Sequence, residues 1–257
     1  MPLLTKSKAF IYIHPRPVLA QVLGVFYHQD HPPDWSQIDT YIRRKFVLFQ
    51  YPLPVHHSTS TLLKRNKQLN FILPLNAVYE DLYRNFRRDR KARIRQSNRE
   101  KLLIENCQDP DDLLRLFTKY VSGKIIGGVD PATIDKMRKI ISGSLEQRDG
   151  FLYKIRGNNA EPLAVAFFIK FRKRLIYMYN ASSQEGRRKN ATTAILNEVI
   201  RAHSGSDLIL DFEGSPVKGI ADFYASFGAQ TETYELIEHR SVLAKLYLKF
   251  RKLFLLT

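Results

Sequence analysis

The sequence predicts an α/β protein built around a mixed β-sheet. Three observations lead to this class: two helices with clear start signals, a meander of three strand-like runs, and then an alternation of helix and strand. The predicted ranges in this part of the chain are 109–121, 130–145, 151–156, 163–171, 175–180, 191–203, 208–212, 218–227 and 231–237. The short turns within the meander favour antiparallel pairing of its strands.

The first hundred residues predict three short strands and a short helix, followed by a basic helix. Apolar runs at 9–13, 45–51 and 70–75 are strand-like and are bounded by proline-rich stretches, and 33–45 predicts a short helix. Residues 76–101 predict one helix with Asn76 as its cap. The apolar stripe of this helix thins out toward its end, where basic residues take over.

Two helix starts are marked strongly. Asp109-Pro110 and Asp130-Pro131 each place a carboxylate at the capping position and a proline at the first helical position. At the other end of the chain, residues 243–254 predict a basic amphipathic helix.

The net charge of +16 implies an anionic partner, such as nucleic acid, a nucleotide cofactor or lipid phosphates, unless the chain comes from a lineage of basic proteins. Nine basic residues lie within 84–101. Composition leaves open whether this helix contacts RNA, contacts the phosphates of a nucleotide or a lipid-linked molecule, or is a solvated face. The candidate phosphate- or nucleic-acid-binding residues are Arg87, Arg88, Arg90, Lys91, Arg93, Arg95 and Lys218.

The remaining composition suggests a cytoplasmic protein. Cys107 is the single cysteine and cannot form an internal disulfide, and no apolar run reaches the length of a membrane span. Peripheral contact with the inner membrane face stays open. His28, Asp30 and His31 invite a metal site, but their loop is proline-rich and lacks cysteine, so no metal is expected.

Three segments carry a resemblance to a known superfamily. The order of elements in the second half, and the pattern with which it closes, are similar to the GNAT acyltransferase fold. Residues 73–97 resemble the start of the second unit in Fem-like, peptidoglycan-bridge-type tandem GNAT enzymes, and residues 1–26 resemble part of their degenerate first unit. The residues of the closing pattern are Ala221, Phe223, Tyr224, Phe227 and Gly228.

The resemblance implies two units. Residues 1–75 would form a partial, degenerate GNAT-like unit, and residues 76–257 a complete acyltransferase unit. In that family a few dozen residues precede the stretch that matches the start of this sequence. We therefore expect Met1 to be internal, with an in-frame extension upstream, or else the member to be truncated.

The resemblance also suggests catalytic groups at the end of one strand and on the helix that follows. In the GNAT mechanism an amine attacks an acyl thioester, and a tyrosine protonates the leaving thiolate. Tyr224 stands at that position, although a packing role is the alternative. Asp211 and Glu213 share one side of their strand by its two-residue period, and either is a candidate base or amine anchor. Glu213 could instead cap the turn that follows.

The donor's pyrophosphate in this fold is held where a strand leads into a helix, here within 180–194. The superfamily motif R-x-x-G-x-G/A would place glycine at Asn190 and a small residue at Thr192, so the match is degenerate. A solvated basic loop is the alternative. The candidate cofactor-binding residues are Tyr179, Asn180, Ala181, Gly186, Arg187, Arg188, Lys189 and Asn190.

The expected function is a bacterial N-acyltransferase of cell-envelope biosynthesis. It would move an acyl group from acyl-CoA, such as acetyl-CoA, to an amine on a sugar- or peptide-linked acceptor, which could be lipid-linked. An aminoacyl-tRNA donor is the main alternative. Fem-type enzymes carry Phe-Lys where this chain has Phe223-Tyr224, and a tyrosine suits a thiolate leaving group better, although Lys218 is near in sequence. A third possible function is a non-catalytic scaffold that binds anions.

Overall fold

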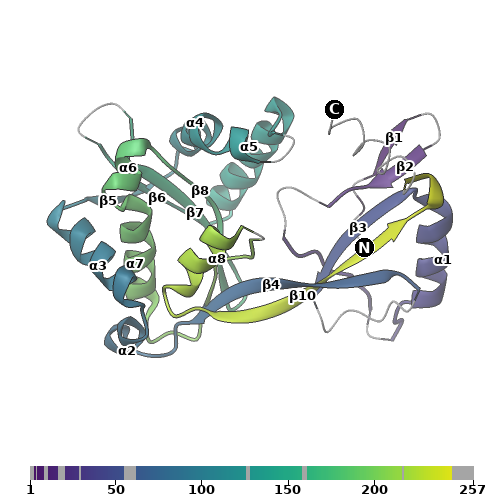
Figure 1. The fold of residues 1–257 in the computed structure, drawn as a ribbon, viewed down its shortest axis with the longest axis horizontal. Coiled ribbons are helices and arrows are strands. Elements are labelled where there is room, and N and C mark those ends of the chain that lie inside the picture. Colours follow the sequence, from purple (N-terminus) through teal and green to yellow (C-terminus); the bar gives the residue numbers. More distant parts are fainter. Residues whose placement is uncertain are drawn as a thin grey trace. The chain divides into compact units, whose positions relative to one another are not determined.

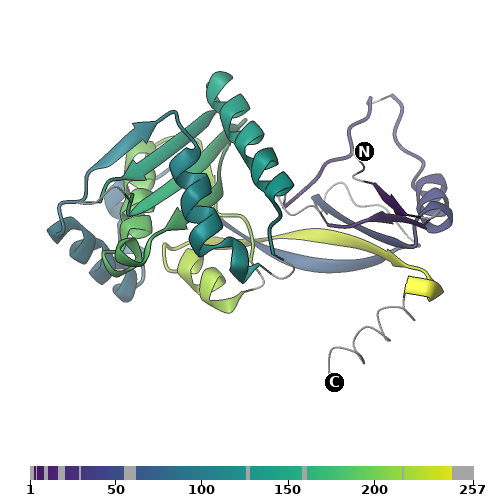
Figure 2. The same cartoon turned by 90° about the horizontal axis from the view of Figure 1, so that it is seen from above.

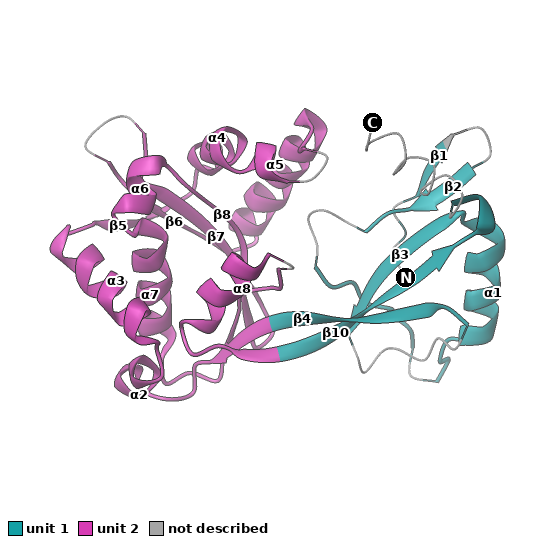
Figure 3. Ribbon diagram, viewed as in Figure 1, with its two compact units in different colours: residues 1–70, 232–257 teal, residues 71–231 magenta. Residues whose placement is uncertain are grey.

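The structure is a computed structural model of the whole chain. It describes residues 3, 5–8, 11–16, 21–28, 30–54, 62–125, 128–157, 161–215 and 217–244. The chain divides into two compact units, shown in Figure 3: residues 1–70 with 232–257 form unit 1, and residues 71–231 form unit 2. The boundaries fall within two long strands, β4 (Lys64–Pro74) and β10 (Gln230–Arg240). That residues 1–75 are a degenerate GNAT copy and residues 76–257 a complete acyltransferase unit stays a prediction.

Unit 1 contains a sheet with the order β1-β2-β3-β10-β4. Its other elements are β1 (Lys6–Lys8), β2 (Ile11–His14), α1 (Trp35–Lys45) and β3 (Leu48–Pro54). The predicted helix forms because the Asp34 carboxylate accepts hydrogen bonds from the amides of Ser36 and Gln37. Its buried Ile42 packs with Phe49, Tyr51 and Leu53 of β3 in the core of this unit.

Unit 2 contains a mixed sheet with the order β4-β9-β8-β7-β6-β5. Figure 1 labels its strands β5, β6, β7 and β8. Its further strands are β5 (Ile104–Cys107), β6 (Gly150–Ile155), β7 (Ala164–Phe171), β8 (Arg174–Ser182) and β9 (Ile209–Asp211). The pairs are antiparallel except β8 with β9, which is parallel. The predicted α/β class with a mixed sheet and the antiparallel meander are therefore confirmed.

Helices cover both faces of this sheet, as Figure 2 shows for α4 and α5 in teal and α7 in green. The helices of unit 2 are α2 (Tyr79–Arg84), α3 (Arg88–Arg99), α4 (Asp111–Tyr120), a 3₁₀ turn at Ser122–Lys124, α5 (Pro131–Glu146), α6 (Gln184–Arg188), α7 (Ala191–His203) and α8 (Lys218–Ala225). The strand residues Ala164 to Phe168 of β7 are all buried, which is the pattern of a strand covered on both faces. None of the described helices combines the length and the apolar composition that a membrane crossing needs.

Most predicted elements occur within a few residues of their expected ranges, and the one signalled by Asp130-Pro131 begins as predicted, with the Asp130 side chain bonded to the Thr133 amide. The single helix predicted for 76–101 is wrong. It is broken between α2 and α3 at Arg87, whose backbone is extended and whose amide donates to the Ser226 carbonyl (2.9 Å). The N-cap of α2 is Val78 rather than Asn76. The helix predicted for 243–254 lies beyond Ala244, outside the described residues, except at its start.

Gly186 of α6 is required by close packing. A Cβ atom at this position would lie 1.8 Å from the backbone oxygen of Leu163, so no side chain fits. The same Leu163 oxygen accepts from the Ser183 amide (3.0 Å), which fixes the turn between β8 and α6 against the start of β7. This contact holds the loop that leads into α7.

We expect Gly186→Ala to destabilise the protein by about 1–3 kcal/mol, because the backbone of Leu163 or of α6 must move to admit the methyl group. Urea denaturation followed by circular dichroism measures the change. Gly143→Ala is the matched control: Gly143 lies inside α5 with nothing within 4 Å of the added Cβ, and should gain about 0.5–1 kcal/mol from helix propensity. If Gly186→Ala leaves the free energy of unfolding unchanged, the packing argument is wrong.

Candidate functional site

Strands β8 and β9 separate after a short parallel contact. They pair only at Arg174–Ile209, Leu175–Leu210 and Ile176–Asp211, whereas β8 continues to Ser182. Beyond Asp211 the chain follows β4 instead, because the Phe212 amide donates to the Phe71 carbonyl (2.9 Å). The far half of β8 therefore has no β9 partner, as the sequence-based hypothesis of two diverging parallel strands requires.

A β-bulge in the same part of β8 redirects its side chains. Phe167 is opposite Tyr179 and Phe168 is opposite Tyr177, so Met178 is an extra residue in the ladder. Because Phe167 and Phe168 face opposite sides of β7, Tyr177 and Tyr179 also face opposite sides, although they are two residues apart. Tyr177 packs on Phe168 and joins the core beneath α7, while Tyr179 stacks on Phe167.

A cavity of about 550 Å³ lies within unit 2 and takes its walls from α3, β8, α6, α7 and α8. Its volume is in the range of small-molecule and cofactor sites. The lining residues are Arg87, Asp89, Arg90, Arg93, Tyr177, Asn180, Ser182, Gly186, Arg187, Asn190, Thr192, Thr193, Gly219, Ile220, Asp222, Phe223 and Tyr224. Four arginines against two aspartates make this wall basic.

Tyr224 lies in the cavity wall within a group of aromatic rings. Its ring stacks on Phe212 (centroids 5.1 Å apart) and meets Tyr177 edge to face (6.3 Å). Burial raises the pKa of the Tyr224 phenol, and the nearby charge of Glu213 raises it further. The hydroxyl therefore stays protonated at neutral pH and can donate a proton or a hydrogen bond.

Tyr177 is the site residue that sequence inspection missed. Its side chain is 2% exposed, and its hydroxyl has no hydrogen-bond partner among the described residues. Such a group costs about 1–3 kcal/mol, so an orphan hydroxyl in a cavity wall calls for an explanation. No local signal distinguishes Tyr177 from Tyr179 in sequence, since only the bulge decides which one faces Tyr224.

The two candidate carboxylates have different surroundings. Asp211 is 8% exposed and is engaged by Arg174 (2.6 Å) and by the Glu213 amide (2.9 Å), and it does not line the cavity. These contacts favour a role in fixing the strand end. Glu213 is not a lining residue of the cavity either, but it is half-buried, has the left-handed backbone angle φ of 59°, and lies near enough to Tyr224 to raise the pKa of that phenol. Non-glycine residues in this conformation are uncommon and cluster at functional sites.

Asn190 lies at the position where the resemblance expects glycine. Its φ of 57° is left-handed, a conformation in which asparagine is the common substitute for glycine. Its side chain accepts from Arg93 Nη1 (3.1 Å) and donates to Gln96 Oε1 (3.0 Å), so it does not cap α7. The helix therefore begins at the cavity with Thr192 and Thr193 in its wall and no side-chain cap on its amides.

Of the other residues predicted for donor binding, some line the cavity and some do not. Asn180, Gly186 and Arg187 line the cavity, but the Gly186 amide donates to Ser183 Oγ (3.0 Å) and Arg187 donates to the Ser182 carbonyl (2.8 Å). The remaining four do not line it: Tyr179, Ala181, Arg188 and Lys189. Among these, Lys189 is ion-paired with Glu100 and Glu185, and Ala181 is buried.

The basic segment is divided in the same way. Three of its arginines, Arg87, Arg90 and Arg93, line the cavity. Arg88 and Arg95 are exposed elsewhere on α3. The last two predicted residues do not line the cavity: Lys91 donates to the Arg84 carbonyl, and Lys218 pairs with Asp222 of the cavity wall. Arg90 lies on the buried face of α3 together with Ile94 and Ser97.

No metal-binding arrangement occurs in the part of the chain that the structure describes: no three His, Cys, Asp or Glu side chains are placed to hold an ion. The cavity instead offers phenols, hydroxyls and guanidinium groups, which bind anions and carbonyl groups.

Comparisons with known proteins agree on the fold. No family model and no curated protein matches the sequence. Among solved structures, FemX is similar with a TM-score of 0.59 and 13% identity, over 91% of this chain and 83% of that one. The L-PGS of Bacillus licheniformis is similar with a TM-score of 0.57 and 11% identity, over 96% and 84%. A tandem GNAT protein from the clavulanic acid biosynthesis pathway has a TM-score of 0.50 and 8% identity, over 90% and 74%.

These likenesses extend over nearly the whole chain, and they combine with the parallel contact and separation of β8 and β9. The chain therefore has a GNAT-like fold of the Fem type.

Proposed function

We propose that unit 2 is an N-acyltransferase that takes the acyl group from a thioester, acyl-CoA, and transfers it to an amine. The observation that carries the proposal is the position of Tyr224: a protonated phenol in the wall of a basic cavity, at the point where two parallel strands separate. The amine nitrogen attacks the thioester carbonyl carbon, the C–N bond forms and the C–S bond breaks. Tyr224 gives its proton to the leaving sulfur.

The amine must lose a proton in the same reaction. Glu213 is the better candidate to receive it, directly or through a water molecule, because its charge acts on the Tyr224 phenol. The left-handed backbone at Asn190 supports a donor phosphate near the start of α7, since glycine, which the motif has at this position, adopts that conformation readily. The acceptor is an amine on a sugar- or peptide-linked molecule, which could be lipid-linked.

We expect Tyr224→Phe to lower kcat by about 10²-fold with little change in the KM for acetyl-CoA, because the variant keeps the ring and loses only the acid. Release of the CoA thiol, with glucosamine and a lysine-containing peptide as acceptors, measures the reaction. Tyr153→Phe is the control, since this half-buried phenol lies outside the cavity. Unchanged turnover in Tyr224→Phe would remove the assigned role.

Tyr177→Phe should affect the stability of the protein and its affinity for the donor differently. Without ligand its melting temperature should equal or exceed that of the wild type, because the change removes a buried hydroxyl that has no partner among the described residues. Its affinity for acetyl-CoA, measured by calorimetry, should fall if a polar group of the donor uses this hydroxyl. A lower melting temperature with unchanged affinity would make the hydroxyl structural.

Aminoacyl transfer from charged tRNA is the second candidate. It is favoured by Arg88 and Arg95, which are exposed on α3 outside the cavity and form no ion pair with any described residue. Phosphate contacts of this kind would bind RNA without sequence preference.

The two donors are separable by one pair of measurements. If acyl-CoA is the donor, titration with acetyl-CoA gives a binding heat that Arg88→Ala/Arg95→Ala leaves unchanged. If charged tRNA is the donor, the wild type retains charged over uncharged tRNA, and the double variant loses retention and has a shallower salt dependence. A protein that binds neither would be the non-catalytic scaffold, and the proposed reaction would be wrong.

A further inference from the structure

Arg90 is a buried cation without a buried anion. Its side chain is 4% exposed, and its Nε and Nη1 groups donate to the hydroxyls of Ser226 (2.8 Å) and Thr193 (2.6 Å). Its guanidinium lies over the rings of Phe223 (4.3 Å) and Phe227 (4.6 Å). No described carboxylate forms an ion pair with it, and Nη2 has no hydrogen-bond partner among the described residues. Burial lowers its pKa to about 10, so it is still charged at neutral pH.

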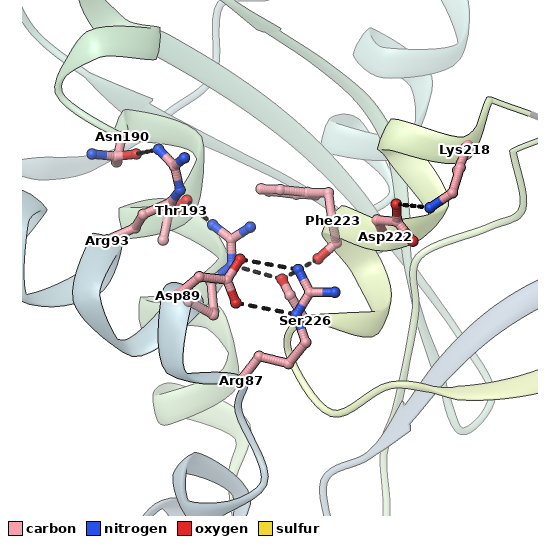
Figure 4. A network of polar contacts seen from close by, with 10 residues as sticks. Arg87, Asp89, Arg93, Asn190, Thr193, Lys218, Asp222, Phe223 and Ser226 are labelled. Carbon is pink, nitrogen blue, oxygen red and sulfur yellow. Dashed lines mark hydrogen bonds and ion pairs between the residues drawn. The ribbon is translucent and has the colours of Figure 1, made fainter.

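The carboxylates of the cavity are committed to other cations. Figure 4 shows Asp89 facing Arg87 and Asp222 facing Lys218, and both contacts are ion pairs (3.0 and 2.6 Å). Arg93 faces Asn190 in the same view, and its partner is the neutral amide oxygen. The wall around Arg90 therefore has positive charge in excess. Both aspartates are ion-paired with other cations, although the charge of Asp89 also acts favourably on the buried guanidinium.

An isolated charge out of water is costly, and proteins normally bury arginine only with a partner. Hydroxyl groups and ring faces offset part of the cost for Arg90. The remaining Nη2 edge is the group that an incoming anion would use, since a guanidinium binds phosphate or carboxylate through paired N–H donors. Thr192 and Thr193 at the start of α7 border the same space.

We propose that Arg90 is the anion-binding residue of the cavity and that the natural ligand places a phosphate or carboxylate group against it. Because Ser226, Phe223 and Phe227 all touch Arg90 from α8 and its C-terminal turn, the bound anion also fixes the segment that carries Tyr224. The proposal names the ligand chemistry of the site proposed above. It does not depend on acyl transfer taking place.

Thermal unfolding of the full chain with inorganic pyrophosphate tests the proposal. Pyrophosphate should raise the melting temperature of the wild type, since a ligand that binds only the folded state stabilises it. Arg90→Met should lose this increase while its melting temperature without ligand stays the same or rises, because an apolar side chain of similar length replaces an unpaired buried charge. Arg88→Met, which removes the same charge from an exposed position on α3, should keep the increase.

Calorimetry identifies which ligand supplies the anion. If the anion is a donor phosphate, Arg90→Met should bind acetyl-CoA about 10- to 100-fold more weakly and S-acetylpantetheine, which has no phosphate, without change. If the anion belongs to the acceptor, neither affinity changes although the effect of pyrophosphate is lost. Should Arg90→Met fail to fold, Arg90→Lys should retain a reduced increase, because it keeps the charge without the planar fork.

Two results would overturn the proposal: no stabilisation of the wild type by pyrophosphate, or the same stabilisation in Arg90→Met. Tyr224→Phe keeps these outcomes apart from failure of the proposed reaction. It should respond to pyrophosphate as the wild type does even if no acyl transfer is found for any variant.

Discussion

The buried guanidinium of Arg90 is the contact on which the arrangement of the cavity depends. It comes from α3, bonds the first turn of α7 through Thr193 and bonds the end of α8 through Ser226. The guanidinium lies over the rings of Phe223 and Phe227, and Phe227 is itself fully buried against Phe86 and Phe212. One side chain thus links three helices that are distant in sequence. It does so with neutral partners, which leaves its charge available to a ligand.

The strands set the other side of the cavity. Strand β9 is short and its continuation follows β4, while β8 stays on β7, so the sheet opens beyond Asp211. The bulge at Met178 lies in the unpaired half of β8, where the ladder to β9 no longer constrains the backbone. Its consequence is chemical: it brings a second phenol, Tyr177, beside Tyr224. An opening in a sheet and a redirected side chain together give a polar site inside an apolar core.

The loop that leads into α7 has a left-handed residue at the position where the superfamily motif has glycine. Asn190 differs from the glycine of the superfamily motif, yet its φ of 57° is the angle that a glycine is selected for. Gly186, four residues earlier, is required for a different reason, since a Cβ there would overlap the Leu163 carbonyl. A comparison of residue identities with the motif therefore misses this similarity, whereas a comparison of backbone conformation detects it.

Local signals in the sequence were sufficient for the order of elements, the mixed α/β class and the helix that starts at Asp130-Pro131, because capping, periodicity and turn chemistry act over a few neighbouring residues. The charge pattern singled out the basic segment, and the resemblance to the superfamily singled out Tyr224. Only the tertiary structure decided that Arg90 is buried while Arg88 is exposed. It also decided that the helix is interrupted at Arg87, whose amide donates to the Ser226 carbonyl, and that Tyr177 rather than Tyr179 faces the cavity. Each of these outcomes depends on a partner more than 100 residues away or on the register between strands, and neither is encoded in a local window.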